Sequence, residues 1–115
     1  MGLSNCSLLI CKILWIETPS NPTLKCCDIE KLCQLARKHG LVSIVDNTFA
    51  TPYLQSPILL GADIVLHSCT KYIGGHTDLL MGAICLNDKE LYEKLSFISK
   101  STSLQLSSSF KRHYV

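Results

Sequence analysis

The chain has 115 residues, enough for one domain, and 47% of them are apolar while only 17% are charged. Soluble domains average about 25% charged residues, so we expect part of the folded surface to meet another protein. The formal net charge is +2 and no basic run is longer than Lys111-Arg112, which argues against a nucleic-acid partner. No apolar run reaches the roughly 18 residues of a membrane-spanning helix, so no membrane partner is expected either.

Cysteine usage indicates a reducing compartment. The chain has seven cysteines, an odd number, and they lack the paired CxxC spacing of a zinc ribbon. An odd count also argues against a disulfide framework. Reduced thiols fit better, so we expect a cytoplasmic protein, and we predict no metal site.

The first predicted element is a buried parallel strand over residues 13–16, a continuous apolar run. Residues 17–23 follow with two prolines, which forbid continued regular structure. This loop lies at the carboxyl end of the strand, where open α/β sheets bind ligands. Asn21 is held between Ser20 and Pro22, so its amide can be aimed at a ligand. On the pattern alone, a plain Asx turn is the favoured alternative.

An amphipathic helix is predicted next, from the cap Asp28 to about His39. Gly40 supplies the left-handed stop. The apolar positions recur at helical spacing, at Ile29, Leu32, Cys33 and Ala36.

A second predicted strand over residues 42–45 ends on Asp46. Burial without a cation would neutralise a carboxylate, so an ionised Asp46 implies a positive partner such as a protonated pyridine nitrogen. A helix cap or turn aspartate is the alternative. Thr48 would orient this carboxylate or simply pack.

A third predicted strand, over residues 64–67, follows a short irregular connection punctuated by Pro52 and Pro57. Lys71 lies just past its carboxyl end, where partial desolvation favours a neutral, nucleophilic amine. Ser68 and Thr70 can donate hydrogen bonds to an anion such as phosphate. These are the parts of a Schiff-base cofactor site, although a solvated loop lysine beside turn-forming hydroxyls is the alternative.

The carboxyl ends of successive parallel strands lie along one edge of a sheet, so we expect Asp46 and Lys71 to lie in the same cavity at that edge. Beyond Gly74-Gly75, residues 81–86 predict a further strand. Asn87-Asp88 caps a final helix that presents Leu91, Leu95 and Ile98 on one face. The serine-rich segment 100–109 has no sustained period and predicts a loose tail.

Three ordered motifs resemble the pyridoxal-phosphate enzymes of cysteine and methionine metabolism, cystathionine gamma-lyases above all. The motifs are Glu17-Thr18-Pro19-Ser20-Asn21-Pro22-Thr23, Val45-Asp46-Asn47-Thr48-Phe49 and Ser68-Cys69-Thr70-Lys71-Tyr72-Ile73-Gly74-Gly75-His76. The resemblance implies an α/β fold, namely a parallel-sheet segment of the large cofactor domain of a fold-type-I, aspartate-aminotransferase-like enzyme. It covers residues 12–98 as a partial pyridoxal-phosphate-binding domain, leaving 1–11 as a non-matching extension and 99–115 as a serine-rich tail.

The resemblance also implies a role for each site residue. Lys71 would carry pyridoxal 5'-phosphate and shuttle protons, while Asp46 would pair the pyridinium nitrogen. Ser68 and Thr70 would hold the phosphate. Asn21 would bond the cofactor's phenolic oxygen or the substrate carboxylate, and Thr48 would orient its neighbours.

The activity implied is α,γ-elimination of cystathionine, a sulfur-containing amino acid, to cysteine, 2-oxobutanoate and ammonia, by a homo-oligomer. Cystathionine gamma-synthase and methionine gamma-lyase activities are alternatives, as is an inactive chain that binds a full-length homologue. The family's glycine phosphate loop, stacking tyrosine and substrate-binding arginine have no counterpart in this sequence, and Thr77 stands where members often have serine. We therefore expect a middle segment of the cofactor domain, inactive alone.

Overall fold

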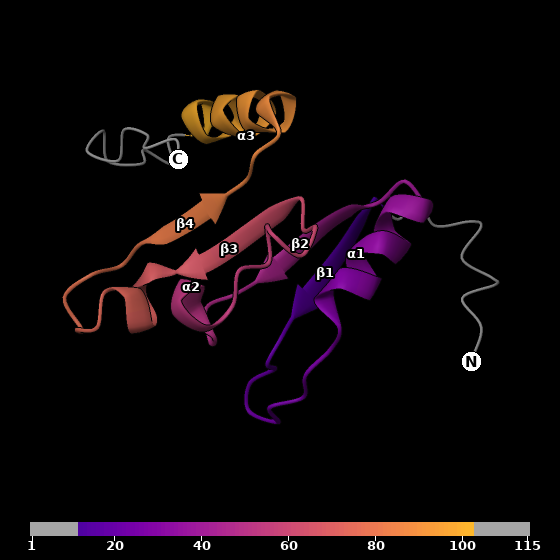
Figure 1. Cartoon of the computed structure of the whole chain (residues 1–115). Helices are drawn as coiled ribbons and strands as arrows, with labels where there is room; N and C mark the ends of the chain where they lie inside the picture. Colours follow the sequence, from indigo (N-terminus) through magenta and orange to yellow (C-terminus); the bar gives the residue numbers. More distant parts are fainter. Residues whose placement is uncertain (1–11, 103–115) are drawn as a thin grey trace.

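The computed structural model describes residues 12–102, arranged as one four-stranded sheet with helices beside it (Figure 1). The sheet order is β1-β2-β3-β4. The strands are β1 (Ile13–Glu17), β2 (Val42–Asp46), β3 (Ile64–Ser68) and β4 (Gly82–Cys85). The helices are α1 (Ile29–Lys38), α2 (Thr51–Leu54) and α3 (Lys89–Ser101). A wide helical turn, Cys69–Ile73, follows β3, and we call it the lysine turn.

The three strands predicted before Lys71 are confirmed, and each ends one residue later than the apolar run that predicted it. β1 pairs with β2 in parallel, and β2 pairs with β3 in parallel. Runs rich in Ile and Val favour the extended backbone and pack well in a covered sheet. The carboxyl ends of these strands therefore meet at one edge, as the sequence predicted.

Helix α1 is confirmed together with its predicted ends. The Asp28 carboxylate accepts a hydrogen bond from the Lys31 backbone amide at 3.1 Å, which caps the first turn. The helix ends at Lys38 with His39 as its C-cap residue. Gly40 follows with φ +64°, a left-handed value that glycine adopts without strain.

Helix α1 covers one face of the sheet and forms the core with it. The core cluster joins this helix to the three parallel strands and consists of Ile16, Ile29, Cys33, Val45, Ala62 and Val65. Burying such side chains contributes roughly 25 cal/mol per Å² of apolar area. The main stabilising contact of the described chain is thus between α1 and β1–β3.

Strand β4 runs antiparallel to β3, so the predicted parallel sheet has one antiparallel edge strand. The reason is the length of the connection. A parallel return needs a crossover of about a dozen residues or more, usually with a helix. Only residues 74–81 separate the lysine turn from β4, so the chain must double back.

Two helices differ from the sequence prediction. Helix α2 was expected to be irregular because of Pro52, but this proline lies in the first turn, where its missing amide is tolerated. Helix α3 begins as predicted, with the Asp88 carboxylate accepting from the Leu91 amide at 2.7 Å, yet it continues to Ser101. The start of the segment predicted as a loose tail is therefore helical.

Residues 1–11 and 103–115 lie outside the described part of the chain, so the predicted division into extension, domain and tail stays a prediction. Within residues 12–102, no helix is both long and apolar enough to cross a membrane.

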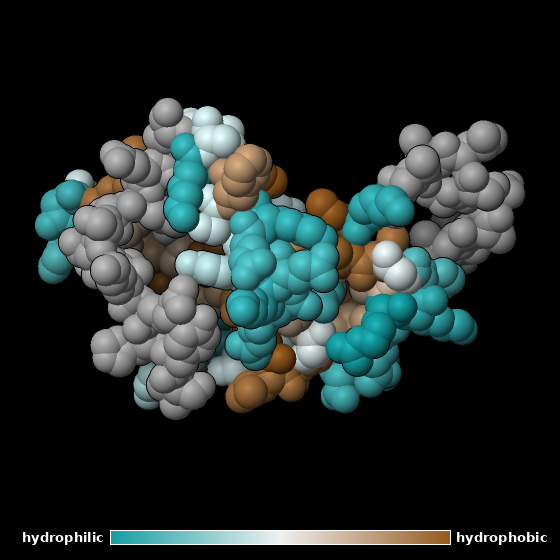
Figure 2. All heavy atoms as spheres, turned by 90° about the horizontal axis from the view of Figure 1, so that it is seen from above, coloured by the Kyte–Doolittle hydropathy of each residue, from teal (hydrophilic) through white to brown (hydrophobic). Residues whose placement is uncertain are grey.

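The face of the sheet opposite α1 carries exposed apolar side chains. Strand alternation points Ile13 and Trp15 away from the core, and Ile84 pairs with Leu66 on the same side. Half or more of each of these three side chains is exposed, and Trp15 reaches 58%. We call Ile13, Trp15 and Ile84 the open face. Seen from above, the molecule has brown apolar side chains at its surface between teal polar ones (Figure 2).

Candidate functional site

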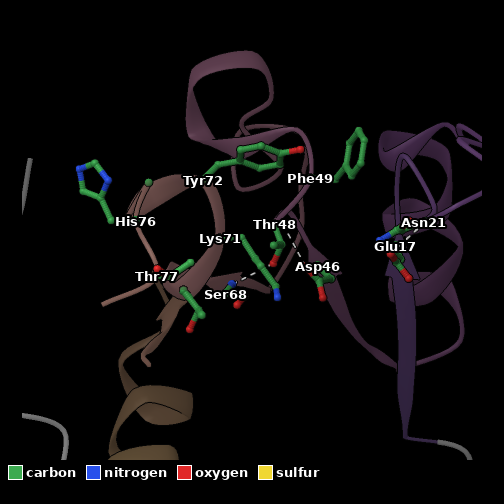
Figure 3. A pocket seen from close by; sticks show the side chains of 12 residues that line it. Glu17, Asn21, Asp46, Thr48, Phe49, Ser68, Lys71, Tyr72, His76 and Thr77 are labelled. Atoms are coloured by element: carbon green, nitrogen blue, oxygen red, sulfur yellow. Dashed lines mark hydrogen bonds between the residues drawn. The ribbon is translucent and has the colours of Figure 1, made fainter. Parts of the chain in front are cut away.

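A hollow of about 660 Å³ lies at the carboxyl edge of the sheet and contains every residue proposed for the site (Figure 3). The loops after β1, β2 and β3 all contribute to it. Its lining residues are Glu17, Asn21, Asp46, Thr48, Phe49, Ser68, Thr70, Lys71, Tyr72, Gly75, His76 and Thr77. The crossover topology therefore brings residues 50 positions apart, Asn21 and Lys71, to one cavity.

Thr48 connects the carboxylate to the loop that carries the lysine. Its backbone amide donates to Asp46 Oδ1 at 2.9 Å, and its Oγ1 accepts from the Ser68 amide at 2.8 Å. All three residues are half-buried. The end of β2 and the end of β3 are thus held together by one side chain, and the orienting role of Thr48 stays a prediction.

The lysine turn places Lys71 in an irregular backbone position. Its ψ of −120° interrupts the helical values on either side. Two amides close the turn behind it, since Gly74 donates to the Cys69 carbonyl at 2.8 Å and Gly75 donates to the Lys71 carbonyl at 2.9 Å. A Cβ at Gly74 would lie 2.7 Å from the Cys69 carbonyl oxygen, so only glycine fits there.

The Lys71 side chain extends along the floor of the hollow, with its amine on the side of Asp46 and Ser68 (Figure 3). The side chain is exposed, so the partial desolvation expected from the sequence is wrong for the described chain. Lys71 does lie just past the carboxyl end of β3, as the strand pattern predicted, but the surrounding residues leave its side chain exposed to water.

Thr70 and Ser68 differ in how free their hydroxyls are. Thr70 Oγ1 accepts from the Met81 amide at 3.2 Å and lies 3.4 Å from the Met81 carbonyl, to which it donates. Within residues 12–102, the Ser68 hydroxyl makes no hydrogen bond. Ser68 is therefore the better-placed donor for an anion, while Thr70 also attaches the entry of β4 to the lysine turn.

Asn21 lies at the far side of the hollow, beside Glu17. Its backbone amide donates to Glu17 Oε1 at 3.3 Å, and both side chains are exposed. The loop after β1 therefore brings Asn21 to one end of the cavity, on the far side of Asp46 from Lys71 (Figure 3).

Sequence reasoning did not assign a role to the aromatic residues of the hollow. Phe49 and Tyr72 form an edge-to-face pair, with ring centroids 6.2 Å apart and an interplanar angle of 86°. Each ring follows a residue of the polar set, because Phe49 comes directly after Thr48 and Tyr72 directly after Lys71. The position of each ring next to a predicted site residue was the sequence signal that could have placed both rings at the hollow. The hollow thus has a polar floor and one aromatic side (Figure 3).

The donor set fits pyridoxal phosphate by its chemistry. A primary amine can bond an aldehyde carbon, a carboxylate can pair a protonated ring nitrogen, and a hydroxyl without a partner can donate to phosphate. Lys71, Asp46 and Ser68 supply these three groups to one cavity. Within residues 12–102, no group of three or more His, Cys, Asp or Glu side chains could hold a metal ion.

A mostly parallel α/β sheet with a lysine, a carboxylate and hydroxyls at its carboxyl edge defines a cofactor-binding segment of an enzyme. Residues 9–111 match the family described as Cys/Met metabolism PLP-dependent enzyme, and the chain belongs to that family. Pyridoxal phosphate is the cofactor of this family, and its members act on sulfur-containing amino acids.

Individual relatives agree with this membership. A probable cystathionine gamma-synthase of Herpetosiphon aurantiacus is 57% identical over 90 residues, which are 78% of this chain and 28% of the relative. A cystathionine gamma-lyase of Bacillus subtilis strain 168 is 54% identical over 91 residues, 79% of this chain and 24% of the relative. The chain thus spans about a quarter of the length of the curated relatives it matches.

A solved structure confirms the expected fold class. The cystathionine gamma synthase from Xanthomonas oryzae pv. oryzae, in complex with aminoacrylate and cysteine, superposes with a TM-score of 0.80 at 46% identity. The match covers 84% of this chain and 25% of that chain. The α/β sheet described above is therefore the same arrangement that these pyridoxal-phosphate enzymes contain.

Proposed function

We propose that this chain supplies the lysine-bearing part of a pyridoxal-phosphate-dependent lyase that acts on cystathionine. The observation that carries the proposal is the convergence of Lys71, Asp46 and Ser68 on one hollow. The three groups come from the ends of two neighbouring strands, and Thr48 holds those ends together.

In the proposed site, Lys71 would hold the cofactor through its amine, and the same amine would accept the proton that leaves the substrate's Cα. Bound pyridoxal phosphate supplies an electron sink next to that carbon. Asp46 would pair the ring nitrogen, and Thr48 holds one of the Asp46 oxygens in place. A charge held there favours the protonated ring nitrogen.

The remaining predicted residues would bind and orient. Ser68 would donate its free hydroxyl to the phosphate, and Thr70 would join it by turning its hydrogen away from the Met81 carbonyl. Asn21 would bond the phenolic oxygen or the substrate carboxylate from the other side of the hollow.

The reaction we propose for the whole enzyme is α,γ-elimination, in which cystathionine and water give cysteine, 2-oxobutanoate and ammonia. The relatives named above include both a gamma-lyase and a gamma-synthase, so cystathionine gamma-synthase activity is an alternative, and methionine gamma-lyase activity is another. The described residues form the cofactor side of the site, and the choice among these reactions depends on contacts to the substrate.

We further propose a cytoplasmic homo-oligomer. The described cysteines support the compartment, because all five are free thiols: Cys26, Cys27, Cys33, Cys69 and Cys85. The open face supports association with other chains, because water-exposed apolar side chains of Ile13, Trp15 and Ile84 would be buried in a contact.

The same face supports a second candidate function. A catalytically inactive chain could bind a full-length homologue through the open face and alter its assembly. To separate this function from catalysis, the chain that carries Lys71→Ala is mixed with a full-length homologue of unchanged sequence. Removal of the amine abolishes any activity of the chain itself but leaves an assembly effect intact.

The cofactor site is tested by mixing the chain with pyridoxal phosphate, reducing with borohydride, and mapping the modified peptides. Labelling should favour Lys71 over Lys25, Lys38 and Lys89, although all four side chains are exposed. Asp46→Asn should reduce this preference, while Asp78→Asn, an exposed aspartate that does not line the hollow, should leave it unchanged. Equal labelling of the four lysines would overturn the proposed site.

A further inference from the structure

The two strand ends on the Asn21 side of the hollow are joined by the side chain of Gln55, which does not itself line the hollow. Gln55 follows α2, and its Nε2 donates to the Thr18 carbonyl at 3.0 Å and to Asn47 Oδ1 at 2.9 Å. In return, Asn47 Nδ2 donates to the Gln55 carbonyl at 2.9 Å. We call Thr18, Asn47 and Gln55 the amide clamp.

The amide clamp is largely shielded from water. Thr18 is 3% exposed, Asn47 is 1% exposed, and Gln55 is half-buried. A buried acceptor that loses its donor is left with the cost of its desolvation. We therefore expect the three hydrogen bonds to persist whether or not a ligand occupies the hollow.

The clamp residues stand next to two predicted site residues. Thr18 is the first residue after β1 and lies three positions before Asn21, while Asn47 directly follows Asp46 at the end of β2. Asn47 is itself fixed, because its backbone amide donates to strand β3 at 2.9 Å and its carbonyl accepts from helix α2 at 3.0 Å. The loop that carries Asn21 is thus attached to a fixed point beside the carboxylate.

Within residues 12–102, Gln55 makes the one side-chain hydrogen bond that joins this loop to another strand end. The other side-chain hydrogen bonds of residues 18–27 stay inside residues 17–27, such as the bond from the Cys27 amide to Thr18 Oγ1 at 3.1 Å. Those bonds shape the loop, but they do not place it relative to Asp46.

The proposed function gives this attachment a consequence for binding, and the inference rests on that function. Asn21 and Asp46 line the same hollow (Figure 3). With Asn21 on the phenolic oxygen and Asp46 on the ring nitrogen of one cofactor, both contacts form together only at one separation of the two side chains. We propose that Gln55 is a positioning residue of the cofactor site, which sets where Asn21 lies relative to Asp46.

A double-mutant cycle tests whether Gln55 acts through Asn21. The chain is titrated with pyridoxal phosphate and reduced with borohydride, and the measurement is the cofactor concentration that labels half of Lys71. Gln55→Met keeps the length of the side chain but removes both hydrogen bonds that it donates. Asn21→Ala removes the amide that Gln55 would place.

Gln34→Met is the matched control for the loss of a glutamine amide. Gln34 is exposed on α1, donates to Glu30 Oε1 at 3.3 Å and does not line the hollow. This variant should keep the wild-type half-labelling concentration.

Gln55→Met and Asn21→Ala should each raise the half-labelling concentration about fivefold, which corresponds to one hydrogen bond. In the Asn21→Ala background, Gln55→Met should change that concentration by a factor close to one, because no amide is left to place. A merely structural role of Gln55 would instead weaken labelling equally in both backgrounds.

Hydrogen exchange of the chain without cofactor gives a second measurement. The amides of residues 20–27 should exchange faster in Gln55→Met, while those of α1 should exchange as in the wild type. Gln55→Asn keeps the amide but is one methylene shorter. It should give the same exchange and labelling pattern, and it replaces Gln55→Met if that variant does not fold.

An equal effect of Gln55→Met with and without Asn21, or no effect of either single substitution, would overturn the inference and leave the proposed function standing. Unchanged exchange over residues 20–27 would overturn it as well. Failure of the proposed function looks different, because Lys71 would then not be labelled preferentially in the wild-type chain. That result would overturn the proposed function and the inference together.

Discussion

The hydroxyl of Thr48 accepts a hydrogen bond of 2.8 Å from the backbone amide of Ser68, and so one side chain sets the distance between two strand ends. The same residue's amide fixes an oxygen of Asp46. The carboxylate and the lysine-bearing loop therefore share a single positioning residue.

Thr48→Val should weaken both the fold and the cofactor site. The valine keeps the shape but leaves the half-buried Ser68 amide without its acceptor, which should cost about 1 kcal/mol of unfolding free energy. Urea denaturation measures this, and borohydride labelling should show a lower preference for Lys71. Thr48→Ser keeps the oxygen and should restore the labelling preference. Unchanged labelling in Thr48→Val would show that the loops do not depend on this bond.

Stability should fall as the solution becomes acidic, because of His67. Its side chain is only 6% exposed, and within residues 12–102 its Nδ1 has no hydrogen-bond partner. Burial lowers the pKa of His67 below the ordinary 6.5, against the opposing effects of the Asn47 carbonyl and the Asp46 charge. The unfolded chain therefore binds more protons than the folded chain just below pH 6.5, and the unfolding free energy decreases there as pH falls.

The measurement is the slope of unfolding free energy between pH 5 and pH 7, a window set by the ordinary histidine pKa of about 6.5. His67→Phe and His67→Gln should both flatten the slope, whatever their stability at neutral pH. His76→Gln, at an exposed position, should leave the slope as in the wild type. A wild-type slope in both His67 variants would contradict the assignment.

The described chain should self-associate through the open face. Trp15 and Ile84 each expose more than half of their area. Within residues 12–102, the edge strand β4 pairs with β3 alone. Sedimentation should detect species larger than a monomer. Trp15→Lys should shift the chain toward the monomer, whereas Tyr53→Lys, away from the sheet, should have little effect. A monodisperse wild-type monomer would contradict this expectation.

The chain alone should not turn over cystathionine, even with excess pyridoxal phosphate. Orientation of a substrate in an active site supplies roughly 7–11 kcal/mol of a barrier, and residues 12–102 offer the Lys71 amine but leave it exposed to water. The release of cysteine should match that from free cofactor with a lysine-containing peptide. Cysteine release that disappears in Lys71→Ala would refute this prediction and indicate a minimal enzyme.

Strand and helix positions were predictable because local signals were strong and agreed with one another. The run over residues 42–45 predicts β2 to within one residue of its end at Asp46, and the cap at Asp28 coincides with the observed start of α1. The direction of β4 depends on the length of the connection before it. Residues 74–81 are too few for a parallel crossover, so the sequence does contain the signal for an antiparallel strand. Helix α2 was missed because Pro52 can either break a helix or begin one.

The site was predictable for residues at strand ends and less so for residues that act through side-chain contacts. Asp46, Ser68 and Lys71 follow from topology, because parallel strands bring their carboxyl ends together. The bond between Thr70 and Met81, and the ring contact between Phe49 and Tyr72, depend on how the lysine turn folds back. No periodic pattern in the sequence encodes that turn.

The hydrogen bonds between Thr70 and Met81 close the base of a loop, residues 71–80, in which Lys71 is the first residue. Leu80, next to the closed base, is 94% exposed. Lengthening a closed loop costs little, about 0.6 kcal/mol for each doubling. A short peptide reporter inserted before the exposed Leu80 would therefore lengthen the loop at little cost, while the Thr70–Met81 bonds still close it, which makes this position an attachment point for following cofactor binding by fluorescence.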